Sequence, residues 1–421
     1  MPGYELFDER ERKEVAEVME TGVLMRYGFK DVRAGRWKAR EMEEAIRKKA
    51  GVKHALLLAD GTAALTTALA ALGVGSGDEV IMPTFTFVAS FESVMTAGAT
   101  PILADVDDTL CLNPDAVVKV ITPRTKVVMP VHMCGAAADV DALKEVCKSR
   151  GLFLVEDACQ AFGASYKGKF LGGLGGAGCY SFDFNKIVTC GEGGAVVTDD
   201  DEFYKRADMY HDHGHDHGDD DRGAEGHPFP GYNYRISELH AAVGCAQIAK
   251  LDDFVARSRR SKKYFKDALA EIPDITFRRL PDSEGDCGTF LCFFMPDEAR
   301  ARAAARALKE SGAEGVFHWY DNNWHYVRNW RHLKERRFAN PVAPSLLASM
   351  PDYSKADFSA SDRWMSRCIS ISIKLGWNDA EAAAKAQAAA KAVKSALQGG
   401  APQYLSMKQE VLFKGTPRSC R

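Results

Sequence analysis

The sequence predicts an α/β protein with a mostly parallel seven-stranded sheet and a second, smaller α+β domain. Short apolar runs rich in β-branched residues recur between His54 and Asp199, and segments with helical spacing separate the first five of them. Strands that alternate with helices form a parallel sheet covered on both faces. The chain of 421 residues also exceeds the length at which single hydrophobic cores stop growing. We therefore expect two domains.

The large domain is expected to cover residues 1–250. Segments such as TAALTTALAALG and DVDALKEVCKSRG have the apolar spacing of helices between the strands. The seven expected strands are HALLLA from His54, EVIMP from Glu79, TPILADV from Thr100, KVVMPVHM from Lys126, LFLVEDA from Leu152, GCYSF from Gly178 and GGAVVTD from Gly193.

From Leu251 the pattern changes to a long charged helix, LDDFVARSRRSKKYFKDALAEI, followed by the strand-like TFLCFFM and the helix DEARARAAARALKESG. An alanine-rich helix begins near Asn378. These segments predict a small α+β domain over residues 251–396. Residues 397–421 are polar and unpatterned, and we expect them to form a disordered or expression-derived tail.

Composition narrows the functional class. The formal net charge of -3, from 55 basic and 58 acidic residues, supplies no field that would gather nucleic acid or an anionic membrane. No run approaches the roughly 20 apolar residues of a membrane span, and the start, MPGYELFDERERKEV, has no apolar signal region. The eleven cysteines are scattered singly, which is typical of reduced thiols. We expect a soluble cytoplasmic protein that binds neither nucleic acid nor membrane.

The carboxyl ends of the strands carry the polar residues of interest, because open parallel sheets bind their ligands there. Gly61 and Thr62 follow the first strand and open a helix, whose free N–H groups suit a phosphate, although a plain helix cap is the alternative. Asp157 ends the fifth strand, where it either caps a helix or pairs with a buried cation. Ser181 and Lys186 follow the sixth strand. These residues place a phosphate cradle, a carboxylate and a lysine at one sheet edge.

Pyridoxal 5'-phosphate (PLP) requires this combination. Its aldehyde needs an amine for a Schiff base, its phosphate needs N–H donors, and its pyridine nitrogen needs an anionic partner to stay protonated. A solvated loop charge is the plainer interpretation of Lys186 taken alone. The other residues at the same sheet edge favour the cofactor.

Six stretches in chain order resemble the DegT/DnrJ/EryC1/StrS family of sugar aminotransferases, over essentially all of residues 1–396. The resemblance implies the aspartate aminotransferase-like fold, called fold type I, and a homodimer with shared active sites at the subunit interface. The stretches are DGTAAL, PTFTFVAS, VHMCGAAADVDAL, VEDACQAFGASYKG, YSFDFNKIVTCGEGGAVVTD and GYNYRISELHAAVGCAQI.

The resemblance also implies roles for single residues. Lys186 corresponds to the lysine that forms the Schiff base and moves the proton, and Asp157 to the partner of the pyridine nitrogen. Relatives with this fold that remove a sugar hydroxyl carry histidine instead of that lysine, so Lys186 favours transamination. The other implied cofactor contacts are Gln160 at the phenolic oxygen, Phe87 stacked on the ring, Gly61, Thr62 and Ser181 at the phosphate, and Asn233 reaching that phosphate from the partner subunit.

Four stretches depart from the common family pattern and bear on the substrate: LMRYGF, YHDHGHDHGDDDRGAEGH, FHWYDNNWHYVRNW and CISISIKLGWND. Alternating histidines could indicate zinc, but the interleaved aspartates and glycines argue against a stiff strand, no cysteine helps, and the chemistry needs no metal. We expect no metal site. The residues expected to contact the substrate, chiefly as cations facing an anionic group, are Arg26, His217, Arg222, His325 and Lys374.

Within the family, these stretches are most similar to an aminotransferase that acts on an eight-carbon sugar acid. The expected reaction transfers an amino group from glutamate to the C8 aldehyde of 3-deoxy-8-oxo-octulosonate, which gives 8-amino-3,8-dideoxy-octulosonate for lipopolysaccharide. The alternative acceptor is a nucleotide-linked 3- or 4-keto-sugar. A catalytically silent regulatory protein would be expected to lose Lys186 or Asp157, and both are present.

Overall fold

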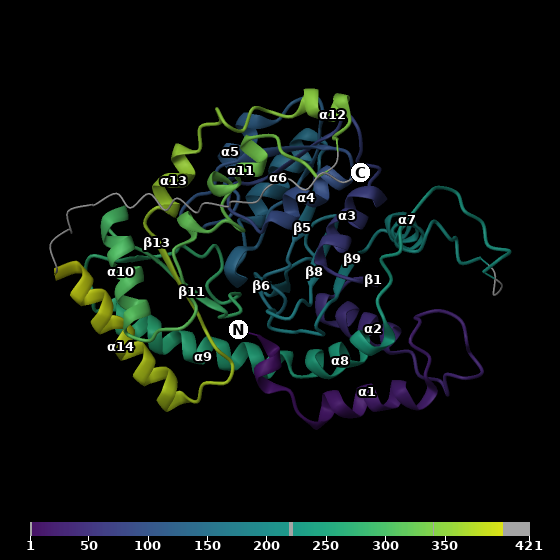
Figure 1. Ribbon diagram of the computed structural model, residues 1–421, viewed down its shortest axis with the longest axis horizontal. Helices are drawn as coiled ribbons and strands as arrows, with labels where there is room; N and C mark the ends of the chain where they lie inside the picture. The colour runs from purple at the N-terminus through teal and green to yellow at the C-terminus, as the bar shows by residue number, and fades with distance from the viewer. Residues whose placement is uncertain (1, 219–221, 340, 399–421) are drawn as a thin grey trace, which may run out of the picture.

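The computed structural model describes residues 2–218, 222–339 and 341–398, and a seven-stranded sheet lies at its centre (Figure 1). The strand order is β1-β9-β8-β5-β4-β2-β3, and β9 alone runs against the other six. The expected α/β class and the mostly parallel seven-stranded sheet are confirmed. The strands are β1 (His54–Leu58), β2 (Glu79–Pro83), β3 (Thr100–Ala104), β4 (Thr125–Val128), β5 (Phe153–Asp157), β8 (Ala177–Ser181) and β9 (Gly194–Thr198).

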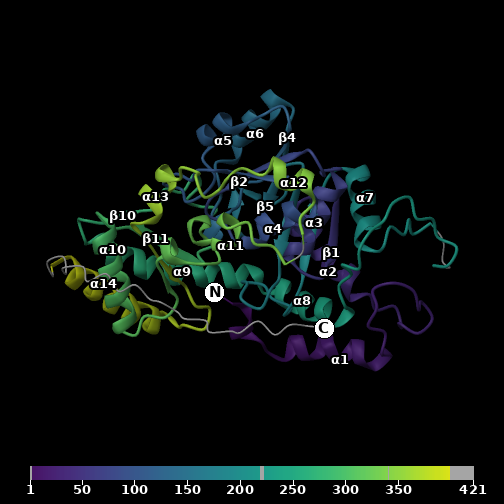
Figure 2. The same cartoon turned by 45° about the horizontal axis from the view of Figure 1, so that its top comes forward.

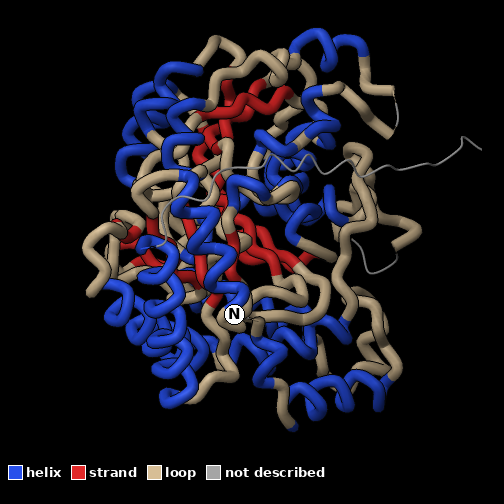
Figure 3. Tube along the Cα trace, turned by 60° about the vertical axis from the view of Figure 1, so that its left-hand side comes forward, coloured by secondary structure: helices blue, strands red, loops and turns tan. Residues whose placement is uncertain are grey.

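Helices cover both faces of this sheet, as Figure 3 shows, so its strands are apolar on both sides. Leu57 faces one hydrophobic cluster, while its neighbours Leu56 and Leu58 face the other. One face packs against α3 (Gly61–Ala71), α4 (Val88–Thr96) and α7 (Asp201–His211). The other face packs against α2 (Lys38–Ala50), α5 (Pro114–Val120), α6 (Val140–Arg150) and α8 (Glu238–Ala249).

A second, antiparallel sheet lies beside the first, at the left of Figure 1, in the order β10-β11-β13-β12. Three helices bury their apolar sides with it in a separate cluster, and the expected alanine-rich helix is the last of them. The elements are β10 (Thr276–Phe277), β11 (Phe290–Phe294), β12 (Val316–Phe317), β13 (Cys368–Ser372), α9 (Leu251–Ala270), α10 (Glu298–Glu310) and α14 (Asp379–Gln398). The division into domains at residue 250 stays a prediction, and residues 399–421 of the expected tail lie outside the described part of the chain.

The segment between β12 and β13 returns to the large sheet. Its helices α11 (Arg331–Lys334) and α12 (Pro344–Ser349) lie over the face of the large sheet that α4 covers (Figure 2). Leu333 and Leu346 pack in the cluster that α3 and α4 form with the sheet. The remaining elements of this segment are η3 (Trp319–Asp321), η4 (Val327–Asn329) and α13 (Ser359–Met365).

Strand-like pairing fixes the start of this segment to the loop after β2. The Thr86 amide donates to the His325 carbonyl and the Val88 amide to the Trp324 carbonyl, each over 2.9 Å. The Val327 amide in turn donates to the Thr84 carbonyl over 3.1 Å. Residues 324–327 are therefore held directly against the residues that flank Phe87.

The N-terminal segment lies along the lower edge of Figure 1, where α1 (Glu9–Thr21) packs beside α8. Asp8 and Glu11 form a capping box that fixes the start of α1. No helix among the described residues is long and apolar enough to cross a membrane. The other short elements are η1 (Gly3–Leu6), η2 (Met133–Gly135), β6 (Ser165–Tyr166) and β7 (Lys169–Phe170).

Candidate active site

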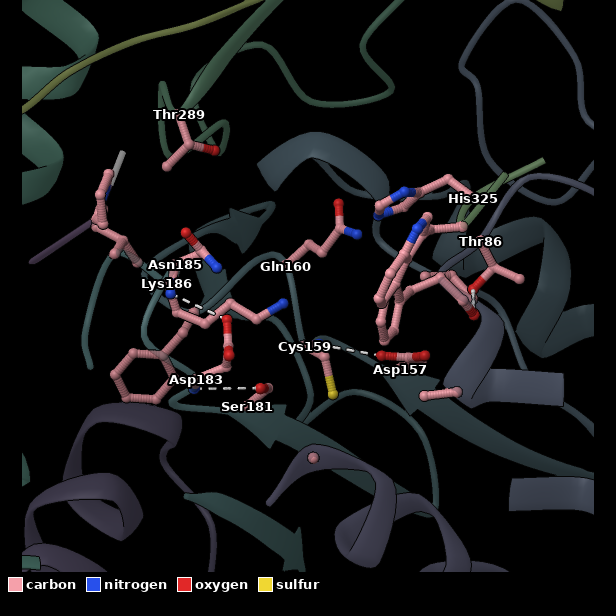
Figure 4. A pocket seen from close by; sticks show the side chains of 18 of the residues that line it. Thr86, Asp157, Cys159, Gln160, Ser181, Asp183, Asn185, Lys186, Thr289 and His325 are labelled. Atoms are coloured by element: carbon pink, nitrogen blue, oxygen red, sulfur yellow. Dashed lines mark hydrogen bonds between the residues drawn. The ribbon is translucent and has the colours of Figure 1, made fainter. Parts of the chain in front are cut away.

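A cavity of about 690 Å³ opens at the carboxyl ends of β1, β2, β5 and β8, and residues of the small sheet close its far side (Figure 4). Four of the predicted site residues, Arg26, His217, Arg222 and Asn233, do not line it. The predicted residues that line it together are Gly61, Thr62, Phe87, Asp157, Gln160, Ser181, Lys186, His325 and Lys374.

The start of α3 forms an anion cradle in this cavity. Asp60 caps the helix by accepting a hydrogen bond from the Ala63 amide over 2.8 Å, so the Gly61 and Thr62 amides remain without an acceptor inside the helix. A Cβ atom on Gly61 would lie only 2.8 Å from Cβ of Ser181. Glycine therefore lets the helix start approach the end of β8, and the two amides and the Ser181 hydroxyl fit a phosphate dianion.

Asp157 is a buried carboxylate that faces the cavity with only 3% of its surface exposed. The Ser90 hydroxyl donates to Oδ2 over 2.7 Å and the Cys159 amide to Oδ1 over 3.1 Å. The Thr86 hydroxyl, 2.6 Å from that of Ser90, extends this chain. In the described residues we find no ion pair for Asp157, and a buried anion without a cation is costly. The protonated ring nitrogen of PLP fits this position.

Gln160 presents a hydrogen-bond donor to the cavity. Its Oε1 accepts a hydrogen bond from the Cys134 amide over 3.1 Å, and only the oxygen of the side-chain amide can do so. The NH₂ group is consequently free to face the cavity, as Figure 4 shows, and it suits the phenolic oxygen of PLP. Phe87, at the start of α4, places its ring 5.2 Å from that of His325.

Lys186 lies in the loop between β8 and β9, and both of its backbone groups are engaged. Its amide donates to the Asp183 carbonyl, and its carbonyl accepts from the Gly3 amide, each over 2.9 Å. The side chain extends into the cavity toward Gln160 and Cys159 (Figure 4). A lysine held in this way can present its amine to the aldehyde of a ligand whose phosphate is bound in the cradle.

His325 is an acceptor in the cavity rather than the cation that the sequence suggested. Burial, followed by the charge of Lys186, lowers the pKa of His325 to about 4, so the ring is neutral at pH 7. Its Nδ1 lies 3.0 Å from Oδ1 of Asn322, and that oxygen is identified by the hydrogen bond it accepts from the Trp324 amide over 2.9 Å. Nδ1 must therefore carry the proton, which leaves Nε2 as a hydrogen-bond acceptor.

The depressed pKa of His325 predicts a pH-dependent stability. The unfolded ring has a pKa near 6.5, so between pH 6.5 and pH 4 the unfolded state binds a proton that the folded state does not. The neutral ring of His325 therefore contributes to the free energy of unfolding above pH 6.5, and this contribution is lost as the pH falls toward 4. Its size is on the order of 3 kcal/mol. We expect the melting temperature of wild-type protein to fall more steeply between pH 7 and pH 4.5 than that of His325→Gln. Parallel pH profiles for the two proteins would contradict this assignment.

The structure argues against the predicted substrate role of Arg26. One guanidinium nitrogen donates to the Leu57 carbonyl over 2.8 Å and another to Glu43 over 2.7 Å, and the side chain is 5% exposed. Arg26 therefore ties the LMRYGF loop to β1 and α2, and it does not line the cavity.

His217, Arg222 and Asn233 gather in a separate cluster around Tyr27 and Asp212. Arg222 donates to both oxygens of Asp212, over 2.8 and 3.0 Å, and His217 stacks on Tyr27 with ring centroids 4.6 Å apart. Asn233 is exposed and forms a β-bridge with Asp212. In one chain, the structure does not bring these three residues to the cavity. Among the described residues, no group of three or more His, Cys, Asp or Glu side chains is arranged so that it could hold a metal ion.

Ser90 and Thr86, which hold Asp157, were not identified from the sequence. A signal did exist, because Ser90 follows Phe87 by three residues and therefore lies one helical turn along α4. Glu5 and Tyr4, from the segment before α1, also escaped notice, although Tyr4 lines the cavity. Nothing in the local pattern places that segment near Lys186.

Residues 6–386 match the DegT/DnrJ/EryC1/StrS aminotransferase family. The chain belongs to this family. GDP-perosamine synthase of Caulobacter vibrioides is 39% identical over 266 residues, which cover 63% of this chain and 68% of that protein. The crystal structure of 3-amino-5-hydroxybenzoic acid synthase is 30% identical, covers 92% of this chain and 97% of its own, and has a TM-score of 0.75. A structure of DesI in the presence of its TDP-sugar product is 28% identical, covers 94% of this chain and 93% of its own, and has a TM-score of 0.74.

Family membership confirms several expectations at once. The protein is a PLP-dependent sugar aminotransferase of fold type I. The cradle, the unpaired carboxylate of Asp157 and Lys186 fit the three polar ends of this cofactor. Membership does not identify the acceptor sugar, for which the named relatives differ.

Proposed function

We propose that this aminotransferase moves an amino group from glutamate to the C8 aldehyde of 3-deoxy-8-oxo-octulosonate, giving 8-amino-3,8-dideoxy-octulosonate for lipopolysaccharide. The charge of the cavity wall carries this proposal. Among its described lining residues, Lys186 and Lys374 are the only lysines or arginines. Since Lys186 serves the cofactor, Lys374 remains as the partner for one substrate carboxylate, such as that of the octulosonate or of glutamate.

Acidic side chains on the same cavity wall favour a substrate that carries few anionic groups. The carboxylates that line it are Asp60, Asp157, Asp183 and Glu192. Burial, with the nearby charges of Asp183 and Asp60, raises the pKa of Glu192 above its ordinary value. A nucleotide diphosphate would add two negative charges to a wall whose described lining residues include one lysine besides Lys186, so a free sugar acid fits better.

The proposed mechanism assigns a task to each residue at the cavity. PLP, when bound, supplies a ring that withdraws electrons from the carbon beside the substrate nitrogen. Lys186 would hold the cofactor through its amine, and Lys186 Nζ would take the proton from the α-carbon of glutamate. Asp157 keeps the ring nitrogen protonated, and His325 Nε2 accepts a hydrogen bond from a substrate hydroxyl.

The second candidate acceptor is a nucleotide-linked keto-sugar. The 39% identity to GDP-perosamine synthase favours it, since that name describes a nucleotide sugar. A half-reaction separates the candidates. We expect the aminated form of the enzyme to return to the PLP absorbance with 8-oxo-octulosonate and to remain unchanged with GDP- or TDP-linked 4-keto-sugars. Rapid amination of the nucleotide sugars, with no reaction of the octulosonate, would refute the proposed acceptor.

We further propose a homodimer in which Asn233 serves the phosphate of the neighbouring subunit. Its exposure, at a distance from its own cavity, supports this arrangement. Mixing inactive Lys186→Ala and Asn233→Ala chains should then restore part of the activity, because one hybrid site holds both intact residues. The measurement is activity after verified subunit exchange, with each variant alone as the control. A monomer by light scattering, or no recovery in verified hybrids, would contradict a shared site.

A further inference from the structure

The segment before α1 forms part of the active-site wall. Pro2 and Tyr4 line the cavity, and the Gly3 amide donates to the carbonyl of Lys186 over 2.9 Å. A Cβ atom on Gly3 would lie 2.1 Å from Oε1 of Gln247 and 2.5 Å from the Ile187 carbonyl oxygen. Only glycine fits this position, so η1 is held against the loop that carries Lys186.

From η1, Glu5 reaches across to the end of β13. Its Oε2 accepts a hydrogen bond from the Gly376 amide over 2.9 Å, and its Oε1 lies 3.5 Å from Nζ of Lys374. The two side chains are 15% and 23% exposed, so solvent screens their attraction only in part. Lys374, which is the one lysine besides Lys186 among the described lining residues, thus already faces a carboxylate of its own chain.

We propose that Glu5 is a specificity-determining residue that competes with substrate carboxylates for Lys374. This inference rests on the proposed function, because it takes Lys374 as the carboxylate site. A bound carboxylate must share the ammonium with Glu5 or displace it, and the two anions repel each other. Glu5 therefore lowers the affinity of the site for every carboxylate ligand and speeds the release of an acidic product.

The charge of Glu5 can be removed while its shape is kept. In Glu5→Gln the amide oxygen still accepts from the Gly376 amide, but the competing charge is gone. The matched control is Glu9→Gln, which makes the same charge change on a side chain that is 86% exposed and pairs with Arg12 outside the cavity. The probe is glutarate, a dicarboxylate that cannot be transaminated, titrated into the PLP-loaded enzyme by calorimetry.

We expect Glu5→Gln to bind glutarate on the order of fivefold more tightly than wild type, whereas Glu9→Gln matches wild type. The neutral diamide of glutarate should show no gain. Lys374→Gln should weaken glutarate binding, and adding Glu5→Gln to it should then have no further effect, since the two residues act through one contact. Glu5→Ala, which also loses the bond to Gly376, should show the same gain as Glu5→Gln.

If neither Glu5→Gln nor Glu5→Ala binds glutarate more tightly than wild type, the proposal is overturned. Weaker binding in Glu5→Gln would also overturn it and would show that Glu5 positions Lys374. A gain that persists on Lys374→Gln would also overturn it, because the effect would not pass through Lys374. These outcomes are independent of the acceptor sugar, since glutarate resembles the donor. Failure of the octulosonate proposal appears only in the half-reaction with sugars.

Discussion

Lys186→Ala is expected to lose turnover by at least on the order of 10³-fold while it still binds PLP noncovalently. The covalent and the proton-transfer roles of the amine disappear together, whereas the cradle at Gly61 and Ser181 and the carboxylate of Asp157 remain. Steady-state kinetics and the absorbance of the bound cofactor measure the two effects. The matched control is Lys374→Ala, which removes the other lysine of the cavity and should raise KM while it retains turnover.

Borohydride reduction tests the same assignment in the wild-type enzyme. Reduction should fix the cofactor to a peptide that contains Lys186, and mass spectrometry of the digest identifies the modified residue. Labelling of any other lysine, or full turnover in Lys186→Ala, would exclude Lys186 as the covalent residue.

Asp157→Asn has the second-largest expected effect, a loss of kcat on the order of 10²- to 10³-fold. The amide has nearly the same shape, and its oxygen still accepts from the Cys159 amide, but it no longer stabilises a protonated ring nitrogen. Steady-state kcat measures the loss. Ser90→Ala is the control, because it removes one hydrogen bond to Asp157 and keeps the charge, and we expect roughly a tenfold loss.

Although Asp157→Asn should lower kcat, it should stabilise the PLP-free protein against unfolding. Without cofactor, the buried carboxylate of Asp157 has no cation within the described residues, so Asp157→Asn should raise the melting temperature of the PLP-free protein. With cofactor, the variant should gain less stability than wild type does. A variant that is less stable in both states, or one with full turnover, would contradict the role assigned to this carboxylate.

The large sheet could be predicted from the sequence because parallel strands are buried on both faces. Runs such as HALLL in β1 and FLVED in β5 are nearly continuous in apolar residues, and the structure places them as expected. Two-residue strands such as β6 and β12 carry no such signal and were missed. The site residues at strand ends could be found for the same topological reason, since the ends of parallel strands meet at one edge.

Residues outside this pattern could not be placed from the sequence, because their environment depends on distant contacts. Arg26 looks like a free loop cation until α2 brings Glu43 beside it. His325 looks like a cationic contact until Asn322, the neighbouring rings and Lys186 fix it as a neutral acceptor. Glu5 lies beside Lys374 only because η1 packs against the loop that carries Lys186.

The pairing of residues 324–327 with residues 84–88 has a consequence for redesign of the acceptor site. Trp324 and His325 do not sit on a lid that opens independently of the cofactor, because their carbonyls are hydrogen-bonded to the two residues that flank Phe87. The wall proposed to meet the sugar and the Phe87 ring expected to stack on the cofactor are therefore joined by backbone hydrogen bonds. Grafting only the WYDNNWHY segment from one relative into another would leave those backbone donors mismatched. To exchange the sugar preference, residues 84–88 and residues 324–327 must be transferred together, because they are hydrogen-bonded to each other.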